Sequence, residues 1–504
     1  MFAAQLIALL VLAWAAERVV YNLFLHPLRD YPGPLLNRAT PLPRMRARLT
    51  GRSPFQSHEL HKRYGKVVRV SPNELSYCDG DAWKDIYGYG SKGSLPRDLR
   101  TQPRGVDGEP SLILTTDNEE HRNLRNVFSP AFSQRALKEQ EPLLLKYINL
   151  FADKIHDVAA ASPSHTVDIT QFFNFATFDI MSDLAFGNPM GLLDRAEYTD
   201  WVRSTFAGIK LFSIRAALSY YIPLLDWLMP LLLPRSLQAK RKAHMKYAAD
   251  QVHARLARGG ALAGRPDIWT LVLRTYDGSH ERVRLSMGQM ESNASLFMVA
   301  GTETTATLLA GAAYLLATHP PAHARLAAEL RAAFAVRADM TLEALQNQSR
   351  LPYLAAVVDE ALRVYPPVPD AQTRRVPGAG VEVAGRWVPG GATVFVTQYA
   401  ANRYPRSWTA PDEFCPERWL PEGEERFGAD ERRACQPFSV GPRNCLGMNL
   451  AYHEIRLLLA YLVWHFDFEL CEESARWMDQ KVFALWAKPP LMIKVTPVPG
   501  RWKE

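Results

Sequence analysis

Cysteine is scarce in this chain, and its spacing argues against two common cysteine-based frameworks. The 504 residues include five cysteines, an odd number, and no two of them form a C-x-x-C pair. Neither a disulfide scaffold nor a structural zinc site is therefore expected. Four of the five are expected to be small side chains with free thiols, and only Cys445 lies in a motif that suggests chemistry. The five are Cys78, Cys415, Cys435, Cys445 and Cys471.

Repeats, low-complexity tracts and long charge blocks are also missing between residue 35 and the C-terminus. One large globular unit is expected there, because 47% of the chain is hydrophobic and can form a large buried core. The net charge of +7 is mild. It permits attraction to anionic lipid or to an acidic protein, but it is no signature of nucleic-acid binding, so no nucleic-acid partner is expected.

The N-terminal apolar segment lacks the basic residues that normally precede the apolar run of a secretory signal. Residues 2–16 carry no charge, and apolar character resumes after Glu17 and Arg18 as far as Leu25. The longer segment reaches the roughly 20 residues that a membrane-spanning helix needs. Residues 13–15 (AWA) resemble a signal-peptidase site, but no Lys or Arg precedes the run. Residues 1–25 are therefore predicted to be an uncleaved membrane anchor.

Positive charge after the apolar segment predicts which side of the membrane holds the rest of the chain. Arginines follow the segment at positions 18, 29, 38, 44, 46 and 48. The positive-inside rule then places the body in the cytosol, where the acceptor sequences at Asn293 and Asn347 would stay unglycosylated. Residues 26–34 (HPLRDYPGP) cannot continue a helix and are predicted to be a stiff hinge. Residues 35–504 are predicted to be the globular body.

Hydrophobic periodicity in the body is mainly helical. Residues 65–78 alternate as in a β-hairpin around residues 71–73, and a second group of strands is predicted at 381–397. Between about 117 and 365, helices are predicted to begin at Asp117 and Asp168 and to run from Ser286 to Thr318. A last helix is predicted from near residue 445 to about 464. The fold class is α+β, predominantly α-helical, with small sheets at the edges.

A glycine pattern at residues 88–93 (GYGSKG) spells the G-x-G-x-x-G fingerprint of dinucleotide-binding folds. That fingerprint requires a preceding strand and a following helix. Here the pattern follows the helical sequence DAWKDIY and runs into Leu95-Pro96. A loop is therefore predicted, and no nicotinamide or flavin fold is expected in this chain.

Residues 438–447 (FSVGPRNCLG) form the motif with the strongest chemical implication. A thiolate at Cys445 at the start of the last helix would be stabilised by the helix dipole and free amides. As a ligand of haem iron it would donate electron density and favour cleavage of the O–O bond. Gly441 and Gly447 allow a tight turn and a close approach of the backbone. Phe438 can shield the sulfur, and Arg443 can pair with a haem propionate.

The segment resembles the F-x-x-G-x-R-x-C-x-G signature of the cytochrome P-450 family. A second match is Glu360-x-x-Arg363, whose charges lie on one helical face and can pair. The flanking apolar residues indicate a buried helix, where an ion pair needs a further polar partner. Arg418, in residues 416–419 (PERW), resembles the family's meander arginine. These three residues are expected to stabilise the fold rather than to take part in the reaction.

The third match is residues 300–305 (AGTETT), which resemble the family's segment over the oxygen-binding face of the haem. Gly301 removes side-chain bulk, and a threonine hydroxyl that competes for helical carbonyls can open the helix locally. Glu303 and Thr304, an acid beside an alcohol, are predicted to relay protons through water to dioxygen. The alternative is that these small residues merely allow close helix packing, which is the more natural role for Thr305.

Three further cationic residues are candidates for binding the haem propionates. His121 and Arg125 lie four residues apart on one predicted helix. Many family members have Trp in place of His121, although the donor role survives this difference. Arg374 lies where the family has another propionate partner, and its neighbour Arg375 leaves that assignment open by one position.

The resemblance extends from the proline-rich segment to Phe468 and implies a function. Residues 26–34, 64–77 and 82–88 most resemble microsomal fungal enzymes of secondary metabolism, such as the isotrichodermin hydroxylase type. The family implies a haem-thiolate monooxygenase that carries haem b and takes electrons from NADPH-cytochrome P-450 reductase, with cytochrome b5 as an additional candidate partner. An endoplasmic-reticulum membrane location with the catalytic domain (35–504) facing the cytosol follows from the anchor.

The substrate is not specified by any motif. Residues 88–115 and 200–235 occupy the positions where family members build the roof of the substrate pocket. The second segment is strongly apolar and is either an access channel that dips into lipid or a core helix. Both favour a hydrophobic small molecule such as a terpenoid or polyketide intermediate. Hydroxylation, epoxidation, desaturation and multistep oxidation are compatible, and a haem-thiolate isomerase or a haem sensor remain the alternative classes.

Overall fold

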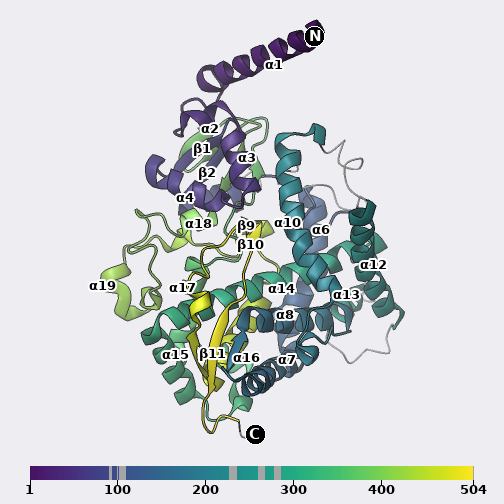
Figure 1. The fold of residues 1–504 in the computed structure, drawn as a ribbon, viewed down its shortest axis with the longest axis vertical. Helices are drawn as coiled ribbons and strands as arrows, with labels where there is room; N and C mark the ends of the chain where they lie inside the picture. Colours follow the sequence, from purple (N-terminus) through teal and green to yellow (C-terminus); the bar gives the residue numbers. More distant parts are fainter. Residues whose placement is uncertain are drawn as a thin grey trace.

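A computed structural model describes residues 1–89, 94–98, 100, 109–225, 235–258, 267–276 and 285–502. Within these residues helices dominate and the strands are short (Figure 1). The helices are α1 (Phe2–Val20), α2 (Leu35–Ala39), α3 (Leu42–Leu49), α4 (Ser53–Tyr64), α5 (Gly80–Tyr87), α6 (Asn118–Phe128), α7 (Gln134–Ala161), α8 (Ile169–Phe186), α9 (Leu192–Arg195), α10 (Asp200–Tyr221), α12 (Arg235–Ala257), α13 (Ile268–Tyr276), α14 (Met287–Thr318), α15 (Pro320–Ala333), α16 (Leu342–Gln346), α17 (Pro352–Val364), α18 (Gln398–Ala401), α19 (Glu424–Phe427) and α20 (Met448–His465).

The strands form four small sheets among the described residues. The largest has the order β1-β2-β7-β4 and combines an antiparallel hairpin with a parallel pairing of β2 and β7. The others pair β3-β11-β8, β5-β6 and β10-β9. The strands are β1 (Val67–Ser71), β2 (Glu74–Tyr77), β3 (Thr166–Asp168), β4 (Arg374–Arg375), β5 (Val381–Val383), β6 (Arg386–Val388), β7 (Thr393–Val396), β8 (Phe466–Leu470), β9 (Val482–Phe483), β10 (Leu485–Trp486) and β11 (Met492–Pro497).

Helix α14 is the central element of the core (Figure 1). It is long and apolar enough to cross a membrane, but 72% of its most apolar window is buried inside the protein. It packs along α8 and also contacts α12, α17 and α20. Burial of most of its surface explains its largely apolar sequence.

Helix starts lie where the capping residues predict them. The Asp117 side chain accepts the backbone N–H groups of Glu119 and Glu120, and Asp168 caps α8. Ser286 and Gln289 form a reciprocal capping box at the start of α14. These side chains satisfy amides that have no partner within the helix. The predicted hairpin, the strands within 381–397 and the last helix are also present, while β3 interrupts the predicted helical region.

The N-terminal helix projects away from the body (Figure 1). No residue of α1 is buried, and the apolar stretch Phe2–Leu25 has a mean hydropathy of 1.7. Residues 26–34, predicted to be a hinge, pack against the body: Leu28 and Tyr31 are buried in the core beside the largest sheet. The Pro32 carbonyl also accepts the Arg69 backbone N–H at 2.7 Å. Apolar side chains within the proline-rich segment therefore attach it to the sheet.

Candidate active site

Cys445 lies in the loop that leads into α20. Its backbone N–H donates to the Phe438 carbonyl at 2.9 Å, which closes the loop. Gly441 has φ +75°, and a Cβ there would lie 2.1 Å from the Tyr87 carbonyl oxygen, so only glycine fits. A Cβ at Gly447 would meet no protein atom within 4 Å. The loop thus presents an open backbone next to the cysteine.

The Cys445 side chain is exposed, unlike Cys78 and Cys435, and all five cysteines are free thiols. Surrounding protein raises the pKa of the Cys445 thiol, whereas the Gly447 backbone N–H and Arg125 lower it. Gly447 is the N-cap of α20. The amide and the guanidinium are the groups that would stabilise a thiolate here. The half-buried Phe438 ring packs against Tyr452 at 5.0 Å between ring centroids.

Four arginines and a histidine gather on one side of this loop, and we call them the cationic cluster. His121 and Arg125 come from α6, Arg374 from β4, and Arg443 from the turn before Cys445. Arg97, which sequence analysis missed, joins them through a β-bridge to Arg374. None of the four arginines forms an ion pair with a carboxylate of the described residues, and the Nε atoms of Arg374 and Arg443 have no hydrogen-bond partner there.

Mutual repulsion is visible in the pKa values of these residues. Burial, and next the charges of Arg374 and Arg443, lower the pKa of Arg97 to about 9. Burial and the Arg374 charge lower the pKa of Arg443 to about 10. Burial and then Arg443 and Arg125 lower the pKa of His121 to about 3. Like charges held this close together, with Arg374 fully buried, favour an anionic partner.

Hydrogen bonds hold part of this cluster in place. Arg125 donates to the carbonyl and side-chain oxygens of Asn444 at 2.7 and 2.6 Å. Arg443 donates to the Thr115 carbonyl at 2.7 Å and to the Asn118 side chain at 3.1 Å. The start of α6 is thereby connected to the cysteine loop. Arg374 is buried and faces the cluster, whereas Arg375 is not among the charges that act on it.

Residues 300–305 of α14 have an accessible face and a buried face. Ala300 is exposed and Thr304 is half-buried one turn later, whereas Thr302, Glu303 and Thr305 are buried. The Thr304 hydroxyl donates to the Ala300 carbonyl at 2.6 Å. The helix remains α-helical through this segment, so the local opening expected from the hydroxyl is not seen. The hydroxyl shares the carbonyl with the helix instead of displacing its hydrogen bond.

Gly301 and Glu303 both contact residues from distant parts of the chain. A Cβ at Gly301 would lie 2.7 Å from the Met181 sulfur, so this glycine allows α14 to pack closely on α8. Glu303 is paired with Lys488, whose Nζ also donates to the Thr307 hydroxyl at 2.6 Å. Sequence analysis missed Lys488 because a lone lysine before two prolines carries no motif.

The structure brings Glu360, Arg363 and Arg418 together, and all three are fully buried. Arg363 donates to both Glu360 carboxylate oxygens at 2.7 and 2.9 Å, and Arg418 lies 3.4 Å from the same carboxylate. Trp419 Nε1 and the Cys415 backbone N–H donate to it as well. Such complete hydrogen bonding is what a buried carboxylate requires.

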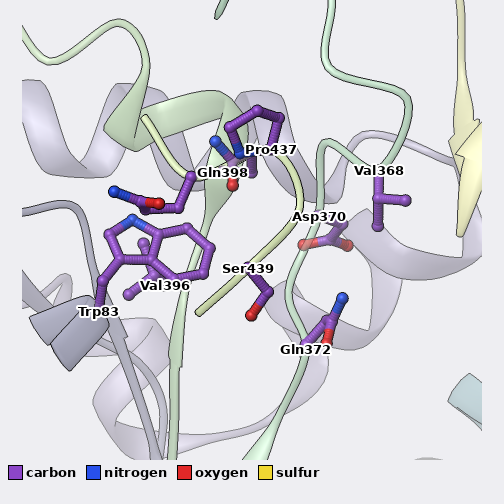
Figure 2. Close-up of a pocket in the computed structure, with 9 residues that line it drawn as sticks. Trp83, Val368, Asp370, Gln372, Val396, Gln398, Pro437 and Ser439 are labelled. Carbon is purple, nitrogen blue, oxygen red and sulfur yellow. The ribbon is translucent and has the colours of Figure 1, made fainter. Parts of the chain in front are cut away.

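A cavity of about 20 Å³ lies behind the cysteine loop, lined by Asp370, Gln372, Gln398 and Ser439 among others (Figure 2). It has room for about one water molecule. The predicted roof segments, 88–115 and 200–235, lie partly outside the described residues, as do positions 90–93 of the glycine pattern.

Comparison with known proteins identifies the family. The Cytochrome P450 family profile matches residues 40–496. The chain belongs to the cytochrome P450 family. It is 42% identical over 478 residues to cytochrome P450 monooxygenase efuB of Hormonema carpetanum, covering 94% of this chain and 93% of the relative. It is 42% identical over 480 residues to cytochrome P450 monooxygenase FUM2 of Gibberella moniliformis, covering 95% and 99%. Averantin hydroxylase of Dothistroma septosporum is 39% identical over 491 residues, covering 97% and 90%.

These matches confirm the predicted resemblance, the fold class and the assignment of this P450 as a monooxygenase. The family carries haem with a thiolate ligand, uses a reductase as redox partner and acts on hydrophobic substrates. The residues of this P450 fit such a group. The Nε atoms of Arg374 and Arg443 are unpaired donors among the described residues and could bind carboxylates, and a side chain at position 447 would meet no protein atom, which leaves room for a close neighbour.

Proposed function

We propose that this P450 inserts one oxygen atom from dioxygen into a hydrophobic small molecule of fungal secondary metabolism, of the terpenoid or polyketide class. Hydroxylation is the principal reaction, and the relative named averantin hydroxylase supports it. Electrons come from NADPH through cytochrome P-450 reductase, with cytochrome b5 as a second donor. The anchor Phe2–Leu25 holds the enzyme on the endoplasmic-reticulum membrane with its body in the cytosol.

The cationic cluster beside an accessible cysteine is the observation that carries the assignment of residues. Cys445 would hold the iron of haem b through its thiolate, which Arg125 and the Gly447 amide would stabilise. His121, Arg125, Arg374 and Arg443, joined by Arg97, bind the two propionates. Phe438 covers the sulfur and Gly447 leaves the backbone open beside it.

The remaining residues manage protons and the fold. When bound, haem with a thiolate ligand activates dioxygen for transfer of one oxygen atom. Thr304 holds a proton at its hydroxyl on the accessible face of α14, and the neighbouring Glu303 exchanges protons with it through water. Gly301 allows α14 to pack close to α8 and so sets the position of this face of α14. Glu360, Arg363 and Arg418 keep the cysteine-loop side of the fold intact.

A spin-state titration of the purified ferric enzyme tests the substrate class. A panel of terpenoids, polyketides, alkaloids and fatty acids is added, and a saturable shift from low to high spin with a terpenoid or polyketide is expected. No shift from any terpenoid or polyketide with the haem fully loaded would contradict the proposed substrate class. The haem ligand has its own test: the reduced carbon monoxide spectrum must be of the thiolate type and must be lost in Cys445→His.

A Thr304→Ala variant separates this proposal from a haem-thiolate isomerase or dehydratase, which uses no dioxygen. Electron use and product formation should become uncoupled, because the relay loses its hydroxyl while haem binding is untouched. An unchanged ratio of product to NADPH would exclude the assigned role of Thr304.

A further inference from the structure

Lys488 is a buried lysine that reaches α14 from a distant part of the chain. It lies between β10 and β11, and its side chain is 4% exposed, against 7% for Glu303. Its Nζ donates to Glu303 Oε1 and, at 2.6 Å, to the hydroxyl of Thr307, one turn further along α14. The ammonium group therefore lies against two successive turns of the helix that carries the proposed proton relay.

The backbone on both sides of Lys488 is anchored. The Trp486 Nε1 donates to the Pro366 carbonyl at 2.8 Å, and the Pro489 carbonyl accepts the Trp477 Nε1 at 2.9 Å. Two prolines follow Lys488 directly and restrict the chain further. The side chain is thus preorganised, unlike a surface lysine that samples many rotamers.

Few other groups can neutralise the Glu303 carboxylate. Lys488 is its only ion-pair partner among the described residues, and its Oε2 atom is buried without a hydrogen-bond partner there. Among the described residues, the other titratable groups on which its charge acts are Tyr198 and Tyr365. Burial raises the pKa of both phenols, and the negative charge of Glu303 adds to each increase. Neither phenol provides a positive charge.

We propose that Lys488 is the positioning residue of the proton relay: its ammonium group holds one oxygen of Glu303 and leaves the second oxygen to exchange protons toward Thr304. This inference rests on the proposed function of Glu303 and Thr304. A buried carboxylate that loses its cation takes up a proton, because burial penalises the charged form. The relay acid would then start in the wrong protonation state.

Infrared difference spectroscopy between acid and alkaline pH reads the carboxyl directly, without substrate or reductase. In Lys488→Met, a protonated carboxyl band should persist to a pH about one to three units higher than in the unmodified enzyme. The band must disappear in the double variant Lys488→Met with Glu303→Gln, which assigns it to Glu303. Lys488→Arg should restore the original behaviour. Lys494→Met makes the same chemical change at an exposed position of β11 and should have no effect.

Reoxidation of the reduced enzyme by dioxygen is the second readout. The midpoint of the pH dependence of this reoxidation should move to higher pH in Lys488→Met by the same amount as the infrared band. Glu303→Gln should abolish this pH dependence, both alone and combined with Lys488→Met. An unchanged infrared band in Lys488→Met would overturn the proposal. A shifted band with an unmoved reoxidation profile would also overturn it, since Lys488 would then only stabilise the fold. The carbon monoxide spectrum of the unmodified enzyme tests the haem-ligand assignment separately.

Discussion

At the scale of single residues, Arg374 and Arg375 form a matched pair of neighbours. Arg374 is 1% exposed and belongs to the cationic cluster, whereas Arg375 follows it on the opposite face of β4. Replacing Arg374 with Gln should have opposite effects on the two forms of the protein. Without haem, the variant should unfold at a higher temperature, because one of several repelling buried charges is gone.

With haem bound, Arg374→Gln should lose the cofactor about 10- to 100-fold faster, since a hydrogen bond to a charged group contributes about 1.5–3 kcal/mol. Transfer of haem to an excess of apomyoglobin measures this rate. The Arg375→Gln control should differ little from the unmodified enzyme in both experiments. Equal haem loss in the two variants would remove Arg374 from the propionate site.

Glu454 gives a second residue-scale prediction, in this case on pH. It is buried on α20, and burial raises its pKa from 4.5 to about 8, although a Thr305 hydrogen bond acts in the other direction. A raised carboxyl pKa means that stability is lost as pH rises from 4.5 to 8, because only the unfolded chain ionises in that window. Glu454→Gln should therefore gain stability relative to the unmodified protein over this range, by about 4 kcal/mol at pH 8. Thermal unfolding of both proteins between pH 5 and 8 checks this, and parallel curves would show that Glu454 is ionised in the fold.

Motif residues could be predicted from sequence, and residues that act through distant contacts could not. Cys445, Arg443 and Gly441 lie within one short segment whose spacing implies a tight turn at a helix start. Arg97 and Lys488 stand alone in their segments and acquire a role only from partners on other elements. Nothing local in a sequence encodes that proximity.

At the scale of elements, the C-terminal end of α10 is fastened to the largest sheet. The Tyr221 hydroxyl donates to Glu74 of β2 at 2.9 Å, and the Tyr220 hydroxyl lies 3.3 Å from the Thr393 hydroxyl of β7. Thr393 stands opposite Arg375, one residue from the cationic cluster. We expect bulky ligands to pass between α10 and this sheet edge, so that these contacts restrain access.

Tyr221→Phe should then increase the binding rate of a bulky haem ligand such as clotrimazole by about tenfold, because a hydrogen bond to a carboxylate is lost. Binding of imidazole, which is much smaller, should keep its rate. Tyr220→Phe removes a longer bond between neutral groups and should have a smaller effect. Stopped-flow absorbance at the haem band measures the binding rate of each ligand to both variants and to the unmodified enzyme. Equal acceleration of both ligands would argue against a restraint on size.

Element boundaries were predictable where a cap or a turn defines them, as at Asp117, Asp168 and Ser286. The parallel pairing of β2 with β7 was not, because it joins strands separated by most of the chain. One expectation about α14 was wrong. Its threonines were expected to open the helix, but the packed core around it keeps the hydrogen-bond ladder closed.

At the scale of the whole molecule, the sequence predicts an anchor, a hinge and a globular body. In the structure Leu28 and Tyr31 are fully or almost fully buried, so the predicted hinge packs against the body. Composition alone could not show this, because a proline-rich segment with two apolar residues is compatible with either a free linker or a docked strand.

Two truncations of the N-terminus distinguish membrane attachment from folding. Removal of residues 2–20 deletes only α1, which buries nothing, and keeps Asn22, whose side chain donates to the Ala39 carbonyl at 2.8 Å. This shorter protein should move from the membrane fraction to the soluble fraction with an unchanged unfolding temperature and carbon monoxide spectrum. Removal of residues 2–34 also deletes Leu28 and Tyr31 from the core and should destabilise the fold by about 3–6 kcal/mol. Sedimentation and thermal unfolding measure the two effects independently. If the protein without residues 2–20 stays with the membrane fraction, the body itself binds lipid and α1 is not the sole anchor. If the protein without residues 2–34 is equally stable, the proline-rich segment is a free hinge.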